Sequence, residues 1–182
     1  MLDIKIVVVE KLDKKQQQKV KALQKVAFKG VTEKEVEEDF YNPEVAHALA
    51  YKDRELVGWA GIHMVKVSFK NRQLKVGGFG ICTHPSWQRK GIATMICKKV
   101  MKFIKSRSCD VAFLSVDVTN IASVKLHQKN GFVMLPGKFS WTNSKGKVKK
   151  GDGGMIAPVN SQKIFQQILQ SKEVFYVGKG YW

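Results

Sequence analysis

A change of hydrophobic period at Gly91 constrains this chain more than any other feature of its sequence. The segment before it, 76–83, is apolar and favours β-structure. The residues after it place apolar side chains three and four positions apart, which predicts a helix with one buried face: Ile92, Met95, Ile96, Val100, Phe103 and Ile104. The segment 88–93, QRKGIA, is therefore predicted to join a strand to a helix.

The start of that helix is predicted to bind an anion. The first N–H groups of a helix have no partner within it, and they lie at the positive end of the helix dipole. Arg89 and Lys90 add two cations directly before Gly91. Unpaired N–H groups and nearby positive charge together favour a phosphate at this position.

The rest of the chain mixes helical and strand patterns. Strands are expected at 5–10, 111–117, 132–135, 155–159 and 173–178, and helices at 13–28, 31–40, 119–131 and around 164–169. The segment 45–84 reads as three antiparallel strands with polar turns at 52–55 and 70–73, and 140–154 reads as a basic hairpin. Gly131 is expected just past the end of its helix. This order predicts one α/β domain, residues 1–182.

The charge balance suggests an anionic partner. The sequence has 32 lysines and arginines against 15 acidic residues, a net charge of +17. Such a field attracts polyanions such as nucleic acid, a ribosome or a phosphorylated cofactor, although a solvated basic surface needs no partner. With 44% hydrophobic and 26% charged residues, the composition is typical of a soluble globular protein.

Several function classes are not expected from this sequence. No apolar run approaches the roughly 18 residues of a membrane span, and the segment 1–11 reads as a first strand rather than a signal peptide. Cys82, Cys97 and Cys109 lack paired spacing, which favours free thiols in a reducing cytoplasm. No zinc-binding spacing is present, so no metal is expected.

Two motifs in this order resemble the GNAT superfamily of N-acetyltransferases. The segment 88–93 has the Gln-x-x-Gly-x-Ala form of the family's acetyl-coenzyme A loop, after a THP strand end at 83–85, and 120–132, NIASVKLHQKNGF, is similar to the second family motif. The ending 173–182, EVFYVGKGYW, is similar to the aminoglycoside 2′-N-acetyltransferase branch. The resemblance implies the GNAT fold: a mixed central sheet with an antiparallel N-terminal meander, splayed fourth and fifth strands, and flanking helices.

The resemblance also implies acetyl-coenzyme A as cosubstrate and transfer of its acetyl group to a primary amine. The pyrophosphate would lie over the loop residues Gln88, Arg89, Lys90, Gly91, Ile92 and Ala93. The pantetheine arm would pair with the end of the fourth strand at Ile81, Cys82 and Thr83. Asn120 would hydrogen-bond that arm, or would simply cap the helix that starts there.

Catalysis needs a polarised thioester, a deprotonated amine and a proton for the leaving thiolate. Backbone N–H groups near Ile81 are expected to polarise the thioester carbonyl. His127 stands where the family often has a tyrosine that acts as general acid, and an imidazole can donate a proton near neutral pH. The alternative for His127 is a buried histidine satisfied by a backbone carbonyl.

The acceptor side departs from the family pattern. Phe79 stands where many members have a glutamate on the fourth strand, and Gly180 where the 2′ branch has an aspartate. The remaining acceptor candidates are Phe79 itself, the terminal carboxylate of Trp182, and an acidic helix that contains Glu33, Glu35, Glu37, Glu38 and Asp39, of which Glu37 and Glu38 are the site candidates. His63 and His84 are further candidates for the base, and a structural role is favoured for His84.

Three functions remain open at this stage. The first is an acetyl-coenzyme A-dependent N-acetyltransferase with a small-molecule or protein acceptor. The second is a GNAT domain that binds the coenzyme without turnover, and the third is a basic module that binds nucleic acid or a ribosome. A homodimer is left open.

Overall fold

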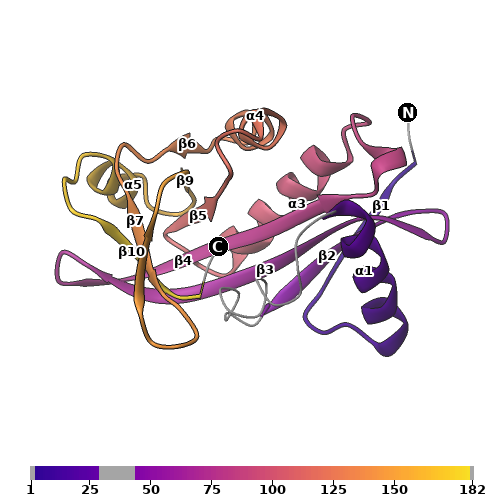
Figure 1. The fold of residues 1–182 in the computed structure, drawn as a ribbon, viewed down its shortest axis with the longest axis horizontal. Coiled ribbons are helices and arrows are strands. Elements are labelled where there is room, and N and C mark those ends of the chain that lie inside the picture. Colours follow the sequence, from indigo (N-terminus) through magenta and orange to yellow (C-terminus); the bar gives the residue numbers. More distant parts are fainter. Residues whose placement is uncertain (1–2, 29–43, 181–182) are drawn as a thin grey trace.

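The computed structural model describes residues 3–28 and 44–180. The predicted helix 31–40 lies outside these residues, and so do the acceptor candidates Glu37, Glu38 and Trp182. The helices are α1 (Lys14–Ala27), the short 3-10 helix η1 (Pro85–Trp87), α3 (Ile92–Ser106), α4 (Ile121–Lys129) and α5 (Gln162–Leu169). The strands are β1 (Lys5–Val9), β2 (Ala46–Lys52), β3 (Glu55–Phe69), β4 (Arg72–Thr83), β5 (Val111–Ser115), β6 (Val133–Met134), β7 (Phe139–Thr142), β8 (Val148–Gly151), β9 (Gly154–Pro158) and β10 (Phe175–Lys179) (Figure 1).

Seven strands form one mixed sheet in the order β1-β2-β3-β4-β5-β9-β6. The pairs β1–β2, β2–β3 and β3–β4 are antiparallel, whereas β4 and β5 run parallel. Within the described part of the chain, β5 pairs with β4 only at Val76 and Gly77, and from Gly78 onward β4 has no paired strand on that side. The predicted antiparallel meander and the splayed fourth and fifth strands are therefore confirmed.

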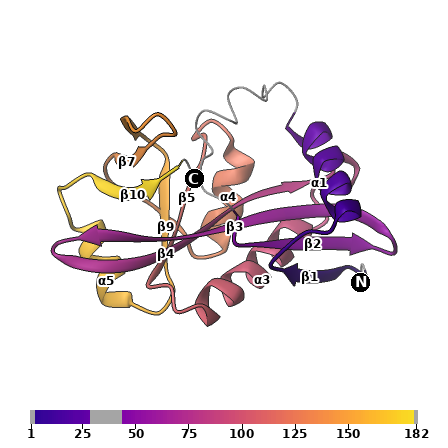
Figure 2. The same ribbon diagram turned by 90° about the horizontal axis from the view of Figure 1, so that it is seen from below.

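Helix α1 lies on one face of the sheet, and α3 and α5 lie on the other (Figure 2). A capping box fixes the start of α1, because the Asp13 side chain accepts from the Gln16 N–H and the Gln16 side chain accepts from the Asp13 N–H. Val20 and Leu23 on this helix are buried in a cluster with Trp59 of β3. This packing holds the C-terminal end of α1 over the end of β4.

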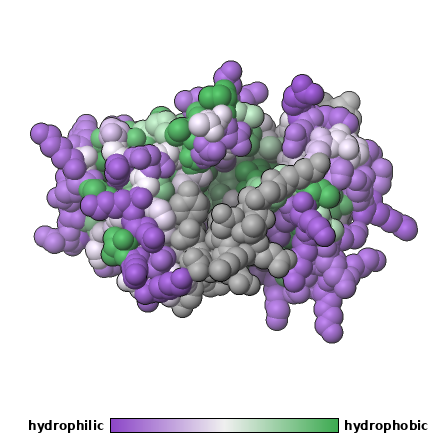
Figure 3. Space-filling view, in the orientation of Figure 1, coloured by the Kyte–Doolittle hydropathy of each residue, from purple (hydrophilic) through white to green (hydrophobic). Residues whose placement is uncertain are grey.

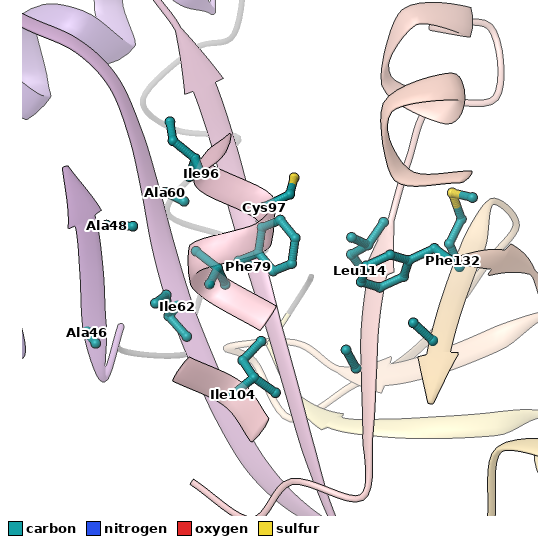
Figure 4. Packing of buried hydrophobic residues seen from close by; sticks show 14 of the residues in the cluster. Ala46, Ala48, Ala60, Ile62, Phe79, Ile96, Cys97, Ile104, Leu114 and Phe132 are labelled. Atoms are coloured by element: carbon teal, nitrogen blue, oxygen red, sulfur yellow. The ribbon is translucent and has the colours of Figure 1, made fainter. Parts of the chain in front are cut away.

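Helix α3 packs its predicted apolar face against the opposite side of the sheet. Ile92, Ile96, Val100 and Ile104 are all almost fully buried in the main core cluster. Figure 4 shows Ile96, Cys97 and Ile104 of this helix beside Phe79 of β4, with Leu114 and Phe132 on the β5 side. Met95, which the spacing also placed on this face, is exposed because it falls at the edge of the apolar stripe.

The C-terminal part of the chain adds a second sheet in the order β10-β7-β8. The predicted hairpin is formed by β7 and β8, and the final strand β10 runs parallel to β7. Strand β9, which follows β8 in the chain, is not part of this sheet. It pairs with β5 and β6 in the main sheet. The predicted helix end at Gly131 is also confirmed, since this residue follows the C-cap Asn130 with a φ of 89°.

The three cysteines are free and buried, as predicted. Burial raises the pKa of Cys82 and of Cys97 to about 12, so neither is a thiolate at neutral pH. None of the described helices combines the length and hydropathy needed to cross a membrane.

Candidate functional site

A cleft of about 590 Å³ opens where β4 ends and α3 begins. Its walls come from the ends of α1 and β4, the loop before α3, and the first turns of α3 and α4. Nine of the ten predicted coenzyme-binding residues line it: Ile81, Cys82, Thr83, Gln88, Arg89, Gly91, Ile92, Ala93 and Asn120. The face that carries α4 shows a recess with apolar surface, surrounded by hydrophilic side chains (Figure 3).

The loop before α3 leaves the backbone at Gly91 open beside this cleft. Gly91 is the N-cap of α3, with a φ of 82° that side chains rarely tolerate. It makes no side-chain capping bond, and a Cβ added there would meet nothing within 4 Å. The first N–H groups of α3 are thus left uncapped beside a space that can admit an anion.

Lys90 is the exception among the predicted loop residues. It does not line the cleft, and its Nζ lies 4.5 Å from the centroid of the Trp87 ring, a cation–π contact. Trp87 itself lines the cleft and was not predicted from the sequence. The Trp-x-x-Lys spacing across a tight turn was the only available signal.

The end of β4 offers unpaired backbone to the same cleft. In an antiparallel pair, successive residues direct their N–H and C=O groups alternately toward and away from the partner strand. Because β5 diverges after Gly77, alternate residues from Gly78 to Thr83 direct these groups into the splay. The Thr83 hydroxyl is buried and has no hydrogen-bond partner among the described residues, which is the pattern expected where a polar ligand binds.

Asn120 serves as the N-cap of α4. Its side-chain oxygen accepts a hydrogen bond of 3.1 Å from the Ser123 N–H. The capping role that the sequence left open is therefore present. Asn120 also lines the cleft, and the contact of its amide NH₂ group with a pantetheine arm stays a prediction.

His127 lies in an aromatic cluster rather than on the cleft lining. It is 3% exposed, and its ring centroid is 5.7 Å from that of Phe79 and 5.6 Å from that of Phe132. Burial lowers the pKa of His127 to about 4, and its Nδ1 has no partner in the described structure. The histidine is therefore neutral at physiological pH. Phe79 is buried in the same cluster, so its predicted acceptor contact stays a prediction.

Glu44 is a candidate that the sequence reasoning missed. Its side chain lies over Gly61 of β3, and Oε2 is 3.8 Å from Nδ1 of His47. Burial raises the pKa of the Glu44 carboxyl above its ordinary value. Gly61 pairs across the sheet with Gly80 of β4, where an added Cβ would meet open space. The carboxylate therefore lies beside this open glycine pair. It lines a hollow with Val20 and Trp59 and is not among the residues that line the cleft at the end of β4.

The other histidine candidates lie in different settings. The Nδ1 of His84 accepts from the Ser86 N–H at 3.3 Å and caps η1, which agrees with the structural role favoured for it. His63 pairs across the sheet with Gly78 and so lies next to the pair formed by Gly61 and Gly80.

No signal in the sequence could have found Glu44, because it precedes a strand and belongs to no periodic pattern.

Solved structures support the fold independently. The ribosomal-protein-S18-alanine N-acetyltransferase from Escherichia coli is 13% identical over 85% of this chain and 94% of that chain, with a TM-score of 0.58. PH1933 from Pyrococcus horikoshii OT3 is 18% identical over 86% of this chain and 98% of that chain, with a TM-score of 0.61. The protein yncA from Salmonella typhimurium, solved with its cofactor acetyl-CoA, is 17% identical over 65% of this chain and 66% of that chain, with a TM-score of 0.50.

Sequence comparisons identify the family. A search of curated protein sequences finds no match. The comparisons give no support to the predicted resemblance to the aminoglycoside 2′-N-acetyltransferase branch. The sequence model described as "Acetyltransferase (GNAT) family" matches residues 17–132, which include β2 to β5, the loop before α3 and all of α4. The chain belongs to the acetyltransferase (GNAT) family.

Proposed function

We propose that this protein transfers the acetyl group of acetyl-coenzyme A to a primary amine. The observation that carries the proposal is the convergence of two features on one cleft. The uncapped start of α3 at Gly91 suits a diphosphate, and the unpaired end of β4 suits the amide-bearing pantetheine arm. Two solved structures of similar fold contain acetyl-CoA or CoA, which supports the same cosubstrate.

The residues of the cleft fit this coenzyme chemically. The N–H groups that follow Gly91 and the guanidinium of Arg89 would hold the pyrophosphate. The orphaned hydroxyl of Thr83 and the amide of Asn120 would bind the polar groups of the arm. When bound, acetyl-CoA supplies an activated acetyl group, and a backbone N–H near Ile81 would polarise its carbonyl.

We assign the acceptor side to Glu44. A carboxylate near the end of β4 can pair with the ammonium of an incoming amine and then take its proton. The raised pKa of Glu44 makes it a better base than an exposed carboxylate. Glu44 would thus take the role of the glutamate that is absent at Phe79. It precedes β2 and lies over β3, whereas the absent glutamate would lie on β4 itself.

The general acid is less well supported at His127. With a pKa of about 4, only about one imidazole in a thousand is protonated at pH 7. A neutral imidazole is too weak an acid to protonate a thiolate. We propose instead that solvent in the open cleft protonates the leaving thiolate, and that His127 packs the wall between β4 and α4.

The test combines coenzyme binding with turnover. Isothermal titration calorimetry with acetyl-CoA should show one site per chain, and release of free thiol should be measured with a panel of polyamines, aminoglycosides and peptides. Binding with turnover of at least one amine class supports the proposal. Binding without any turnover would favour the coenzyme-binding alternative, and absence of binding would refute both.

A further inference from the structure

The positive charge of this protein is concentrated in one part of the chain. The segment 56–151 holds 18 of the 32 lysines and arginines but only 2 of the 15 acidic residues. Both acids are engaged locally: Asp110 accepts from the Lys75 N–H at 2.8 Å, and Asp117 accepts from the N–H and hydroxyl of Thr119. The segment therefore carries almost the whole net charge, with little internal compensation.

Helix α3 gathers part of this charge on its outer surface. Lys98, Lys99, Lys102 and Lys105 are all exposed, and none forms an ion pair with a carboxylate of the described residues. We call these four residues the α3 lysines. Lys98, Lys102 and Lys105 follow the spacing i, i+4, i+7, so they form one stripe about 10 Å long.

The C-terminal end of α3, where the stripe ends, is fixed by contacts to other parts of the chain. Arg107, at the C-terminal end of α3, pairs with Glu10 and receives at its backbone oxygen a 2.6 Å hydrogen bond from Lys75. Asn160, just before α5, donates to the backbone oxygen of Lys105 at 3.1 Å. These contacts hold the C-terminal end of α3 in place. The helix itself lies on the face of the sheet opposite α1 (Figure 2).

We propose that the α3 lysines bind the sugar–phosphate backbone of a nucleic-acid duplex. Lysine is depleted from the cores of protein–protein interfaces, and Met95 is the single large apolar side chain that the described part of α3 exposes beside the stripe. A membrane-surface helix needs an outward apolar face, but the apolar face of α3 is buried against the sheet. A duplex carries a negative charge about every 1.7 Å of its axis and binds such rows of cations without reading its sequence.

A duplex fits this surface better than a single strand. Proteins hold single strands chiefly by stacking bases on exposed aromatic rings. On α3 the ring of Phe103 is only partly exposed and is covered by the Arg107 guanidinium, 4.8 Å from its centroid. The Trp87 ring near the start of α3 is likewise covered by Lys90.

The inference is tested by fluorescence anisotropy with 20-base-pair RNA and DNA duplexes of arbitrary sequence, at 50 and 200 mM KCl. Four phosphate contacts predict an affinity loss of about 100-fold between these salt concentrations. The variant K98Q/K99Q/K102Q/K105Q should lose at least tenfold in affinity at 50 mM and most of the salt dependence. The control K14Q/K15Q/K21Q/K25Q removes the same charge from exposed positions on α1 and should stay within threefold of wild type.

Several results would overturn this assignment. Equal losses in the two variants would show that net charge, and not the α3 stripe, determines binding. Tighter binding to a single strand of the same length would point to base stacking, and binding to phosphatidylserine vesicles but to neither duplex would assign the surface to a membrane. Preference for RNA over DNA, or the reverse, identifies the source of the duplex. Acetyl-CoA affinity measured on the same variants is a separate readout and shows whether they are folded.

Discussion

Gly91 has a positive φ, and the space that a side chain would occupy there is open. We predict that Gly91→Glu abolishes acetyl-CoA binding, because the new side chain strains a residue with a φ of 82° and places a negative charge where the diphosphate would lie. Gly137→Glu is the control, since it adds the same charge at another exposed glycine with nothing within 4 Å. Calorimetry should show no binding for the first and wild-type affinity for the second. Unchanged affinity in Gly91→Glu would remove the coenzyme from this loop.

Glu44 is predicted to act in turnover and not in coenzyme binding. Removal of a general base costs about 10²- to 10⁴-fold in rate, so Glu44→Gln should slow turnover by at least 100-fold with acetyl-CoA affinity unchanged. The acidic limb of the pH–rate profile should disappear too, because the base works only above its pKa. Glu55→Gln neutralises an exposed glutamate at the start of β3 and should keep turnover within twofold. A fully active Glu44→Gln would rule out the assignment.

His127 is predicted to make the fold sensitive to acid. The folded residue has a pKa of about 4, whereas an unfolded histidine titrates near 6.5. Between these values the unfolded chain binds more protons, so the stability present above pH 6.5 declines as the pH falls, by about 3 kcal/mol at pH 4. His47, whose pKa burial also lowers, adds a loss of the same sign.

His127→Phe isolates this contribution. Urea unfolding at pH 7 and pH 4.5 should show a smaller acid-induced loss of stability in His127→Phe than in wild type. The phenylalanine has a ring that does not titrate, so His47 and the carboxyl groups remain as a common background. Identical losses in the two proteins would mean that His127 is accessible to water in the folded state.

At the scale of elements, the approach of α3 to β4 depends on a single glycine. A Cβ at Gly77 would lie 2.6 Å from Cγ2 of Ile104 and 3.2 Å from Sγ of Cys109, both buried. We predict that Gly77→Ala lowers the free energy of unfolding by about 1–3 kcal/mol, which is typical of overpacking. Gly80→Ala in the same strand meets open space and should change it by less than about 0.5 kcal/mol. The urea denaturation midpoints of the two variants test this prediction. Equal midpoints would show that α3 can move away from β4 without a loss of stability.

The strand β4 also shows how an element acquires a function from its neighbours. Its sequence is mostly apolar from Val76 to Cys82, but β5 pairs with it only at Val76 and Gly77. Beyond that point the backbone is free to bind a ligand. The glycines at 77, 78 and 80 marked the region in the sequence, whereas the point of divergence depends on how β5 and β9 pair with each other.

At the scale of the whole molecule, the α3 lysines and the proposed catalytic site lie on different surfaces. Glu44 lies over the face of the sheet that carries α1, and the coenzyme cleft opens at the end of β4. Helix α3, which carries the α3 lysines, lies on the opposite face (Figure 2). A net charge of +17 therefore does not require that the acetyl acceptor be an anion, because acceptor and polyanion would approach from different sides.

The sequence by itself determined the strand, loop and helix around Gly91 and the meander before it, because these depend on local periodicity and on one backbone conformation. Nine of the ten residues that it predicted for coenzyme binding line the cleft. It did not determine the acceptor side. The neutral state of His127, the burial of Phe79 and the position of Glu44 over Gly61 arise from contacts between residues far apart in the chain. Burial and proximity set the pKa of a side chain, and only the packed tertiary structure decides both.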